Sequence, residues 1–139
     1  MIIIHFDGGC SPNPGGPMTY GYIIEVVCDE LPNVVEKRTE GHGERPARSM
    51  NTSNLAEYWG LEIALAHASE QFGTDHELVV YGDSNLVVQH VQGKWKCRKS
   101  HLRKRLKSVL SALSKFKRYT IAHIPRELNR EADELARRS

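Results

Sequence analysis

The sequence predicts an α/β fold in which helices pack on a mixed β-sheet. Apolar segments of strand length alternate along the chain with longer segments of helical period, in the order β-β-β-α-β-α-α-β-α. Two early strand-like segments are joined by a short turn, which is typical of antiparallel neighbours, whereas later strands are separated by helices, which indicates parallel pairing. The 139 residues contain no repeat and no linker, so we expect a single domain over residues 1–139.

The first half of the chain supplies three of the expected strands. The apolar run over residues 2–6 predicts a buried strand, and residues 8–17, which are rich in Gly and Pro, predict a loop. Strand-like segments over residues 20–28 and 34–41 flank a short turn. The polar residues 42–50 are expected to form a second loop.

A long helix is predicted next, with Thr52 or Ser53 as its N-cap and Gly73 at its end. Apolar residues recur at helical spacing between these limits, and Glu57 shares a stripe with small residues suited to close packing on a sheet. The remaining expected elements are a strand over residues 77–81, helices over 84–91 and about 100–116, a strand over 119–124 and a helix over 129–138.

Positive charge is concentrated in one segment of the chain. The formal net charge is only +2, and residues 1–93 carry four Lys or Arg against thirteen Asp or Glu. Residues 94–118 carry eleven Lys or Arg and no acid. A basic segment on an otherwise acidic domain indicates binding to a phosphate backbone, although a solvated basic helix gives the same pattern.

Four acidic residues are predicted to converge at one edge of the sheet. Asp7 and Asp83 each follow an apolar strand, and the carboxyl ends of parallel neighbouring strands meet at the edge where open α/β sheets place their sites. Glu57 is expected to point inward from its helix, and Asp133 lies early in the last helix. Like charges are costly side by side without a cation, and oxygen ligands suit Mg²⁺ or Mn²⁺.

Each of these acids also has a structural explanation. Asp7, which precedes two glycines, could begin a turn, and Asp83 could cap a helix. Glu57 could interact with the helix dipole, and Asp133 could be an exposed helix residue. Their joint occurrence, together with the basic segment, favours a metal site.

Four motifs that contain these acids resemble those of the type 1 ribonuclease H family. They follow the family's order at compatible spacings and cover nearly the whole chain. A single motif would mean little, but the ordered set is specific. The motifs are residues 7–15 (DGGCSPNPG), 52–57 (TSNLAE), 81–85 (YGDSN) and 129–136 (NREADELA).

The resemblance implies a ribonuclease H-like α/β fold, a five-stranded mixed sheet flanked by helices. It implies an endonuclease that hydrolyses the RNA strand of RNA/DNA hybrids and leaves 5′-phosphate and 3′-hydroxyl ends. Two Mg²⁺ ions, for which Mn²⁺ can substitute, would act on the phosphate. By motif position, Asp7 would bridge both ions, with Glu57 and Asp83 on one and Asp133 on the other.

The resemblance also implies residues that read the ribose 2′-hydroxyl of the RNA strand. Asn13, Ser53 and Asn54 occupy matching motif positions, although many relatives carry Asn where this chain has Ser53. Asn13 lies between two prolines and is also a good turn former. Asn85 is a further candidate, with Gln89 one helical turn later.

Trp95 lies between two lysines just before the basic helix. By resemblance it would pack against a sugar of the DNA strand, and the alternative is a core aromatic. Trp59, within the long helix, is interpreted as a core residue. The basic segment is shorter than in family members that carry an inserted basic protrusion.

The chain departs from the better-known family pattern before the last helix. Many relatives carry a histidine on a flexible loop there, and counting ten residues back from Asp133 leads to His123. The alternation of residues 119–124 instead places His123 in a strand that ends before Pro125. On this interpretation the loop is short, and Arg126 is the cation nearest the site. Arg126 could clamp a phosphate but could not move protons, so His123 remains only a possible helper.

Composition excludes several other classes of protein. No apolar run approaches the ~20 residues of a membrane span, and the short apolar start lacks the features of a signal peptide. The three cysteines match no zinc or disulfide spacing, so we expect a cytoplasmic monomer whose partner is an RNA/DNA hybrid and not a membrane. Two alternatives stay open: another nuclease of the same superfold, such as a transposase or Holliday-junction enzyme, and a non-catalytic nucleic-acid-binding module.

Overall fold

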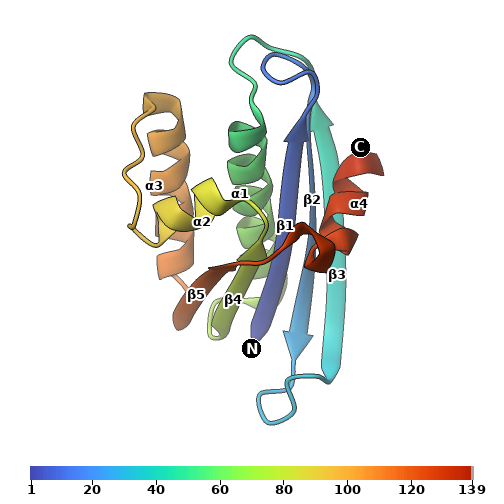
Figure 1. Cartoon of the computed structure of the whole chain (residues 1–139). Coiled ribbons are helices and arrows are strands. Elements are labelled where there is room, and N and C mark those ends of the chain that lie inside the picture. The colour runs from blue at the N-terminus through green and yellow to red at the C-terminus, as the bar shows by residue number, and fades with distance from the viewer. Residues whose placement is uncertain (139) are drawn as a thin grey trace.

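The computed structural model describes residues 1–138 of the protein. Its strands form one mixed sheet in the order β3-β2-β1-β4-β5, so the predicted fold class is confirmed (Figure 1). The strands are β1 (Ile2–Cys10), β2 (Met18–Val27), β3 (Val35–Arg45), β4 (Glu77–Gly82) and β5 (Arg118–His123). The helices are α1 (Ser53–Phe72), α2 (Asn85–Val91), α3 (Ser100–Ser114) and α4 (Arg130–Arg138), with a 3₁₀ turn, η1 (Arg126–Leu128), before α4.

The central strand, β1, is paired differently on its two sides. It runs antiparallel to β2 from Ile2 to Cys10. On its other side it runs parallel to β4 only as far as Phe6, which lies opposite Gly82 at the end of β4. Beyond Phe6, therefore, β1 has no strand on its β4 side, and the sheet is open there.

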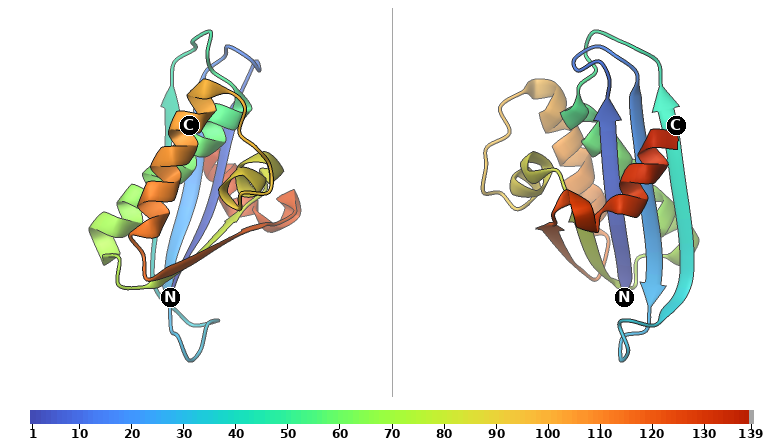
Figure 2. Two further views of the ribbon diagram at one scale, coloured as in Figure 1. Left: turned by 90° about the vertical axis from the view of Figure 1, so that its left-hand side faces the viewer. Right: turned by 45° about the vertical axis from the view of Figure 1, so that its right-hand side comes forward.

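Helices cover both faces of the sheet (Figures 1 and 2). On one face α1 packs across β1 and β2, with α3 packed against α1. On the opposite face α4 packs across β2, β1 and β3. The core between the sheet and α1 contains Ile4 and Phe6 of β1 together with Leu61 and Leu65 of α1, all fully or almost fully buried. The middle of β1 is thus enclosed between two helices.

Two predicted loops prove to be partly strand. Residues 8–10 continue β1, and residues 42–45 continue β3. Two glycines of β3 make room for close neighbours. A Cβ atom on Gly41 would lie 2.4 Å from the Tyr22 ring, and one on Gly43 would lie 2.6 Å from the Tyr20 ring. Each tyrosine therefore covers a glycine of the neighbouring strand, which keeps glycine compatible with a regular sheet.

None of the helices within residues 1–138 is both long and apolar enough to cross a membrane.

Candidate active site

Three of the predicted acids meet where the sheet opens. Asp7 is the first residue of β1 beyond its pairing with β4, and Asp83 is the first residue after β4. Glu57 comes from α1, which packs on β1 and β2. Each of the three offers a carboxylate oxygen, and these oxygens all lie within 4.8 Å of one another. We call these three residues the acidic site.

Close approach of α1 to β1 brings Glu57 into the acidic site. A Cβ atom on Gly8 would lie only 2.4 Å from the main chain of Ala56, and one on Gly60 would lie 3.0 Å from the Asp7 carbonyl oxygen. Glycine at these two places lets the helix backbone rest directly on the strand. Glu57 is consequently 6% exposed, in line with the prediction that it points inward.

Burial dominates the electrostatics of the acidic site. It raises the pKa of Asp7 to about 7, with the neighbouring acids Asp83 and Asp133 adding to the rise, while a hydrogen bond with Glu57 opposes it. The pKa of Glu57 is also raised well above its usual value, first by burial and then by the charge of Asp7. One oxygen of Glu57, Oε1, is buried and has no hydrogen-bond partner among the described residues. Buried carboxylates with an unpartnered oxygen are suited to a divalent cation with oxygen ligands.

The fourth predicted acid, Asp133, lies beside this group in the first turn of α4. Its side chain contributes to the raised pKa of Asp7 and forms an ion pair with Arg137 at 3.1 Å. α4 can come this close because a Cβ atom on Gly21, which pairs with Asp7 across β1 and β2, would lie 2.5 Å from the main chain of α4. The structure therefore brings Asp133 to the rim of the acidic site and leaves it outside the tight group of three.

Asn129 is a residue of this site that sequence reasoning missed. It is 1% exposed, and its Nδ2 donates to the Phe6 carbonyl oxygen at 2.8 Å and to Asp83 Oδ2 at 3.5 Å. It also immediately precedes α4, and its carbonyl accepts from the Asp133 amide in the first turn of that helix at 3.1 Å. Asn129 therefore connects β1, Asp83 and the helix that carries Asp133. The only local signal was an asparagine at the start of a helix, which reads as an ordinary cap.

The predicted 2′-hydroxyl readers gather at the N-terminus of α1. Thr52 caps this helix, its side chain accepting from the Leu55 amide at 3.1 Å. The exposed Asn13 comes from the β1–β2 loop, and its Oδ1 accepts from the Ser53 amide at 3.2 Å. Ser53 and Asn54 are the first two residues of α1 and are partly exposed. Asn13, Ser53 and Asn54 are thus neighbours in space.

Trp95 is exposed and does not belong to the core. It is 47% exposed and lines a pocket of about 260 Å³ with Asn54 and several cations of the basic segment. Trp59, by contrast, is 8% exposed and buried, as predicted. Asn85 begins α2 and accepts from Gln89 at 3.1 Å, so these two side chains hold each other.

The loop before α4 is short, as the strand pattern predicted. His123 is the last residue of β5, and η1 spans Arg126–Leu128 before α4 begins. Both His123 and Arg126 are exposed.

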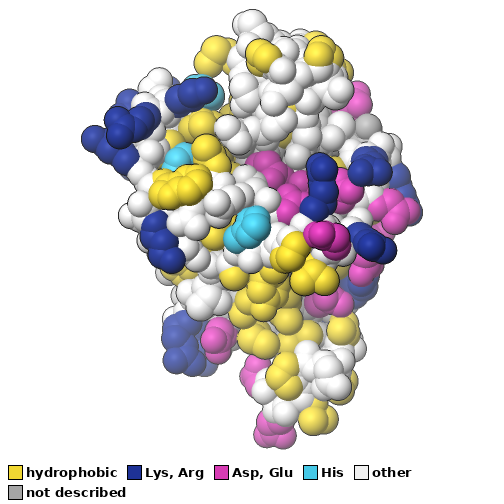
Figure 3. Space-filling view, viewed as in Figure 1, with side chains coloured by type: hydrophobic (Ala, Val, Ile, Leu, Met, Phe, Trp, Pro, Cys, Tyr) yellow, Lys and Arg dark blue, Asp and Glu magenta, His cyan; other side chains and the backbone are white. Residues whose placement is uncertain are grey.

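The basic segment divides into two parts. In the space-filling view many Lys and Arg side chains lie down the left-hand side, and others lie among the acidic side chains at the centre and right (Figure 3). The exposed cations of residues 94–104 lie in the loop before α3 and in its first turns. At the other end of α3, Lys117 pairs with Asp75 at 3.7 Å and Arg118 pairs with Glu77 at 3.6 Å. The positive surface beside the acidic site is therefore formed by the first part of the segment.

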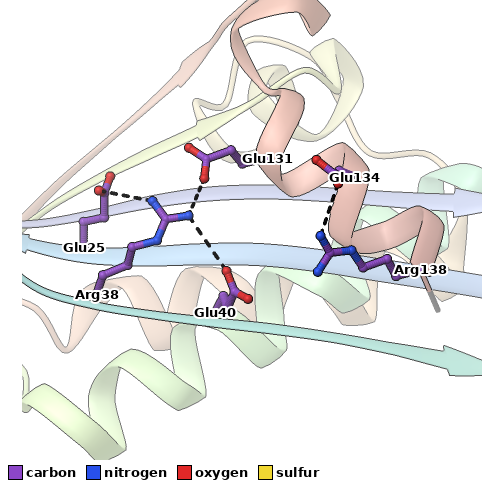
Figure 4. Close-up of polar contacts among 6 residues, drawn as sticks. All are labelled: Glu25, Arg38, Glu40, Glu131, Glu134 and Arg138. Atoms are coloured by element: carbon purple, nitrogen blue, oxygen red, sulfur yellow. Dashed lines mark hydrogen bonds and ion pairs between the residues drawn. The ribbon is translucent and has the colours of Figure 1, made fainter.

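A second carboxylate cluster surrounds Arg38 on the α4 face of the sheet (Figure 4). The Arg38 guanidinium contacts Glu131 of α4 and pairs with Glu25 at 3.7 Å and Glu40 at 3.8 Å. We call these four residues the Arg38 cluster. Sequence reasoning did not identify it, because its members come from β2, β3 and α4.

Comparison with known proteins gives matches over most or all of the chain. A family model described as reverse transcriptase-like matches residues 26–139. The bifunctional protein Rv2228c of Mycobacterium tuberculosis is 33% identical over 135 residues, which are 97% of this chain and 34% of that protein. The chain thus spans about a third of that relative's length.

Two solved structures extend the likeness to three dimensions. RNase H1 from Halobacterium salinarum is 31% identical, with a TM-score of 0.82 over 98% of this chain and 94% of that chain. LC11-RNase H1, solved in complex with an RNA/DNA hybrid, is 30% identical, with a TM-score of 0.79 over 100% of this chain and 96% of that chain.

Proposed function

The chain belongs to the type 1 ribonuclease H family, and from this premise we propose that it is an endonuclease that hydrolyses the RNA strand of RNA/DNA hybrids. One observation carries the proposal. Three carboxylates from β1, α1 and the end of β4 lie within 4.8 Å of one another, and one oxygen of Glu57 is buried with no partner among the described residues. This arrangement is suited to cations that would bring a phosphate to the site.

The proposed ligands are Asp7, Glu57, Asp83 and Asp133, and the proposed cofactor is a pair of Mg²⁺ ions, for which Mn²⁺ can substitute. When bound, such a pair activates water on one side of the phosphate and stabilises the leaving oxygen on the other. Asp7 would contribute to both ions, Glu57 and Asp83 to one, and Asp133 to the other. The proposed products carry 5′-phosphate and 3′-hydroxyl ends.

The remaining side chains would hold and select the substrate. Asn13, Ser53 and Asn54 would contact the 2′-hydroxyl groups of the RNA strand, with Asn85 as a further polar contact. Trp95 would pack against a sugar of the DNA strand, in support of which its ring is exposed beside cations that can bind phosphates.

Arg126 would clamp a phosphate from the short loop before α4, and His123 would at most assist. Arginine suits a phosphate clamp because it stays protonated and offers a planar set of donors.

Cleavage of an end-labelled RNA/DNA hybrid tests the proposal. We expect cutting of the RNA strand with Mg²⁺, none with chelator, and none of the DNA strand or of double-stranded DNA. Tight binding of the hybrid without Mg²⁺-dependent cleavage would instead favour a nucleic-acid-binding module. Cleavage of branched DNA in place of the hybrid would favour another nuclease of the superfold.

A further inference from the structure

Asn51, in the loop between β3 and α1, is buried although the loop around it is exposed. It is 3% exposed, and its side-chain Nδ2 donates to the Gly16 carbonyl at 2.9 Å and to the Pro46 carbonyl at 3.0 Å. Its own carbonyl accepts from the Gly15 amide at 2.9 Å. Both donors of a buried amide are thus used, which ties the β1–β2 loop to the segment that leads into α1.

The β1–β2 loop that Asn51 holds is a compact unit. The Gly16 amide donates to the Pro12 carbonyl at 2.8 Å, and the Ser11 amide donates to the Pro17 carbonyl at 3.3 Å. A Cβ atom on Gly16 would lie 2.4 Å from the main chain of Ser11 and Pro12. These contacts close the loop on itself, so a tether at Gly15 and Gly16 also sets the place of its tip.

The tip of this loop carries Asn13. Its Oδ1 accepts from the Ser53 amide at the start of α1, at 3.2 Å. Because the oxygen is engaged, Nδ2 is the group of the Asn13 amide that remains to donate to a ligand. It lies at the start of α1, the helix that carries Glu57. The place of this donor relative to Glu57 depends on how the loop is tethered to α1.

We propose that Asn51 is a positioning residue for recognition of the RNA strand. By clamping the β1–β2 loop to the entry of α1, it fixes the distance between the Asn13 amide and the acidic site, so that Asn13 meets a ribose 2′-hydroxyl at a set distance from the bond that is cut. This inference rests on the proposed function, and it concerns selection of the sugar, not binding of metal or phosphate.

A cycle between protein variants and sugar substitutions tests this role. Cleavage rates are measured on an all-RNA strand in a hybrid and on strands with one 2′-deoxynucleotide scanned through the residues next to the cut. Wild-type protein should lose a factor on the order of 10 at the nucleotide read by Asn13, the effect of one hydrogen bond. The cleavage rate of Asn51→Ala on the all-RNA strand should be lower than that of wild type by a similar factor. Removing the 2′-hydroxyl at the nucleotide read by Asn13 should not lower the rate of this variant any further. Adding Asn51→Ala to Asn13→Ala should cost no additional activity.

The controls separate recognition from folding and from the assignment itself. Asn33→Ala, in the exposed turn between β2 and β3, should behave as wild type. If thermal melts show Asn51→Ala to be unfolded, Asn51→Ser, which keeps a hydroxyl donor, is measured in the same way, with a smaller loss expected. If the cleavage rate of an Asn51 variant is lower than that of wild type by the same factor on the all-RNA strand and on every 2′-deoxy strand, Asn51 has no role in recognition. That result would leave the ribonuclease assignment intact. Wild-type protein indifferent to every 2′-hydroxyl would overturn both.

Discussion

The acidic site and the Arg38 cluster each gather three carboxylates on the same sheet, yet they are built in opposite ways. The Arg38 cluster contains its own cation, and its side chains are between 21% and 66% exposed. The acidic site has no Lys or Arg within ion-pair distance of its three acids in the described part of the chain, and Asp7 and Glu57 are each 6% exposed. The nearest arginine contact is the ion pair of Arg137 with Asp133, at the rim, so the expectation that Arg126 is the cation nearest the site is wrong.

This difference separates a structural arrangement of acids from one that requires a ligand. Exposed ion pairs such as those of Arg38 contribute at most about 1 kcal/mol, because water solvates the separated charges nearly as well. Buried acids without a cation cost free energy that folding alone does not recover. The acidic site is therefore unfavourable to the fold, and its buried carboxylates are suited to a divalent cation.

The largest expected effect follows from removing a ligand of the acidic site. We predict that Asp7→Asn or Asp83→Asn abolishes cleavage and leaves hybrid binding intact, because the proposed phosphate contacts lie elsewhere. Turnover of a labelled hybrid and its affinity are measured for each variant. Glu40→Gln, in the Arg38 cluster, is the matched control and should retain wild-type activity. Substantial Mg²⁺-dependent turnover by either Asp variant would contradict the assignment.

The second effect concerns stability and pH without metal. The pKa of Asp7 is raised to about 7 in the folded protein, so the folded state holds a proton that the unfolded state releases near pH 4. Unfolding free energy should therefore be greatest at low pH, fall between about pH 4 and pH 7, and level off above that, by roughly a few kcal/mol in all.

Thermal or urea unfolding in chelator measures this dependence. Asp7→Asn should remove the part of this fall that is due to Asp7, leave the part due to the buried Glu57, and be more stable than wild type above pH 7. Millimolar Mg²⁺ should raise the stability of the wild type at pH 7 and above. A wild-type protein whose metal-free stability rises steadily from pH 4 to pH 7 would show that these carboxylates are not buried as described.

A third prediction compares cations that are mostly free to bind phosphates with cations that mostly pair already with acids of this chain. Replacing Arg103, Lys104 and Arg105 by Ala should weaken hybrid binding and reduce the slope of log affinity against log salt concentration by roughly 2. Each lost phosphate contact reduces this slope by ~0.9 or less, and Arg105 is already paired with Glu62. Replacing Lys115, Lys117 and Arg118, at the far end of α3, should leave the slope nearly unchanged. Equal slopes for both triple variants and wild type would identify the basic helix as a solvated surface.

The smallest expected effect concerns the loop before α4. We predict that Arg126→Ala lowers turnover more than His123→Ala, because Arg126 would hold a phosphate whereas His123 ends a strand. Neither variant should abolish turnover, because a guanidinium that holds a phosphate does not transfer protons in the reaction. Turnover of both variants on one hybrid, with thermal melts to verify folding, decides the order. A large, pH-dependent loss confined to a stably folded His123→Ala would restore a histidine mechanism.

Sequence periodicity was sufficient for most of the fold. The Ile-rich start of β1 and the apolar stripe of α1 have patterns that only one kind of element satisfies, and α1 spans Ser53–Phe72 as predicted. The prediction failed where residues rich in Gly and Pro (8–10) and polar residues (42–45) were interpreted as loops. Gly8 and Gly43 lie in strands because a helix backbone and a tyrosine ring occupy the space that a side chain would fill, and no local pattern records such a neighbour.

The acidic residues could be located from the sequence, but the side chains that hold the surrounding segments in place could not. Carboxylates after two strands converge by topology, which a one-dimensional pattern can express. Asn129 and Asn51 act through main-chain carbonyls of Phe6 and Gly16, which are remote in sequence. A side chain that donates to a distant carbonyl leaves no spacing to read, since every residue offers the same acceptor.

The glycines next to Asp7 have a consequence for how this protein can change over generations. Gly8 admits α1 on one side of β1, and Gly21 admits α4 on the other. A side chain at either place would disturb packing whether or not the protein cuts anything, whereas exchanging Asp7 for a neutral residue relieves buried charge. In a lineage freed from selection for catalysis, the acids should therefore be the first residues to drift, while both glycines persist. A descendant that has become inactive would be recognised by this combination of retained glycines and lost acids.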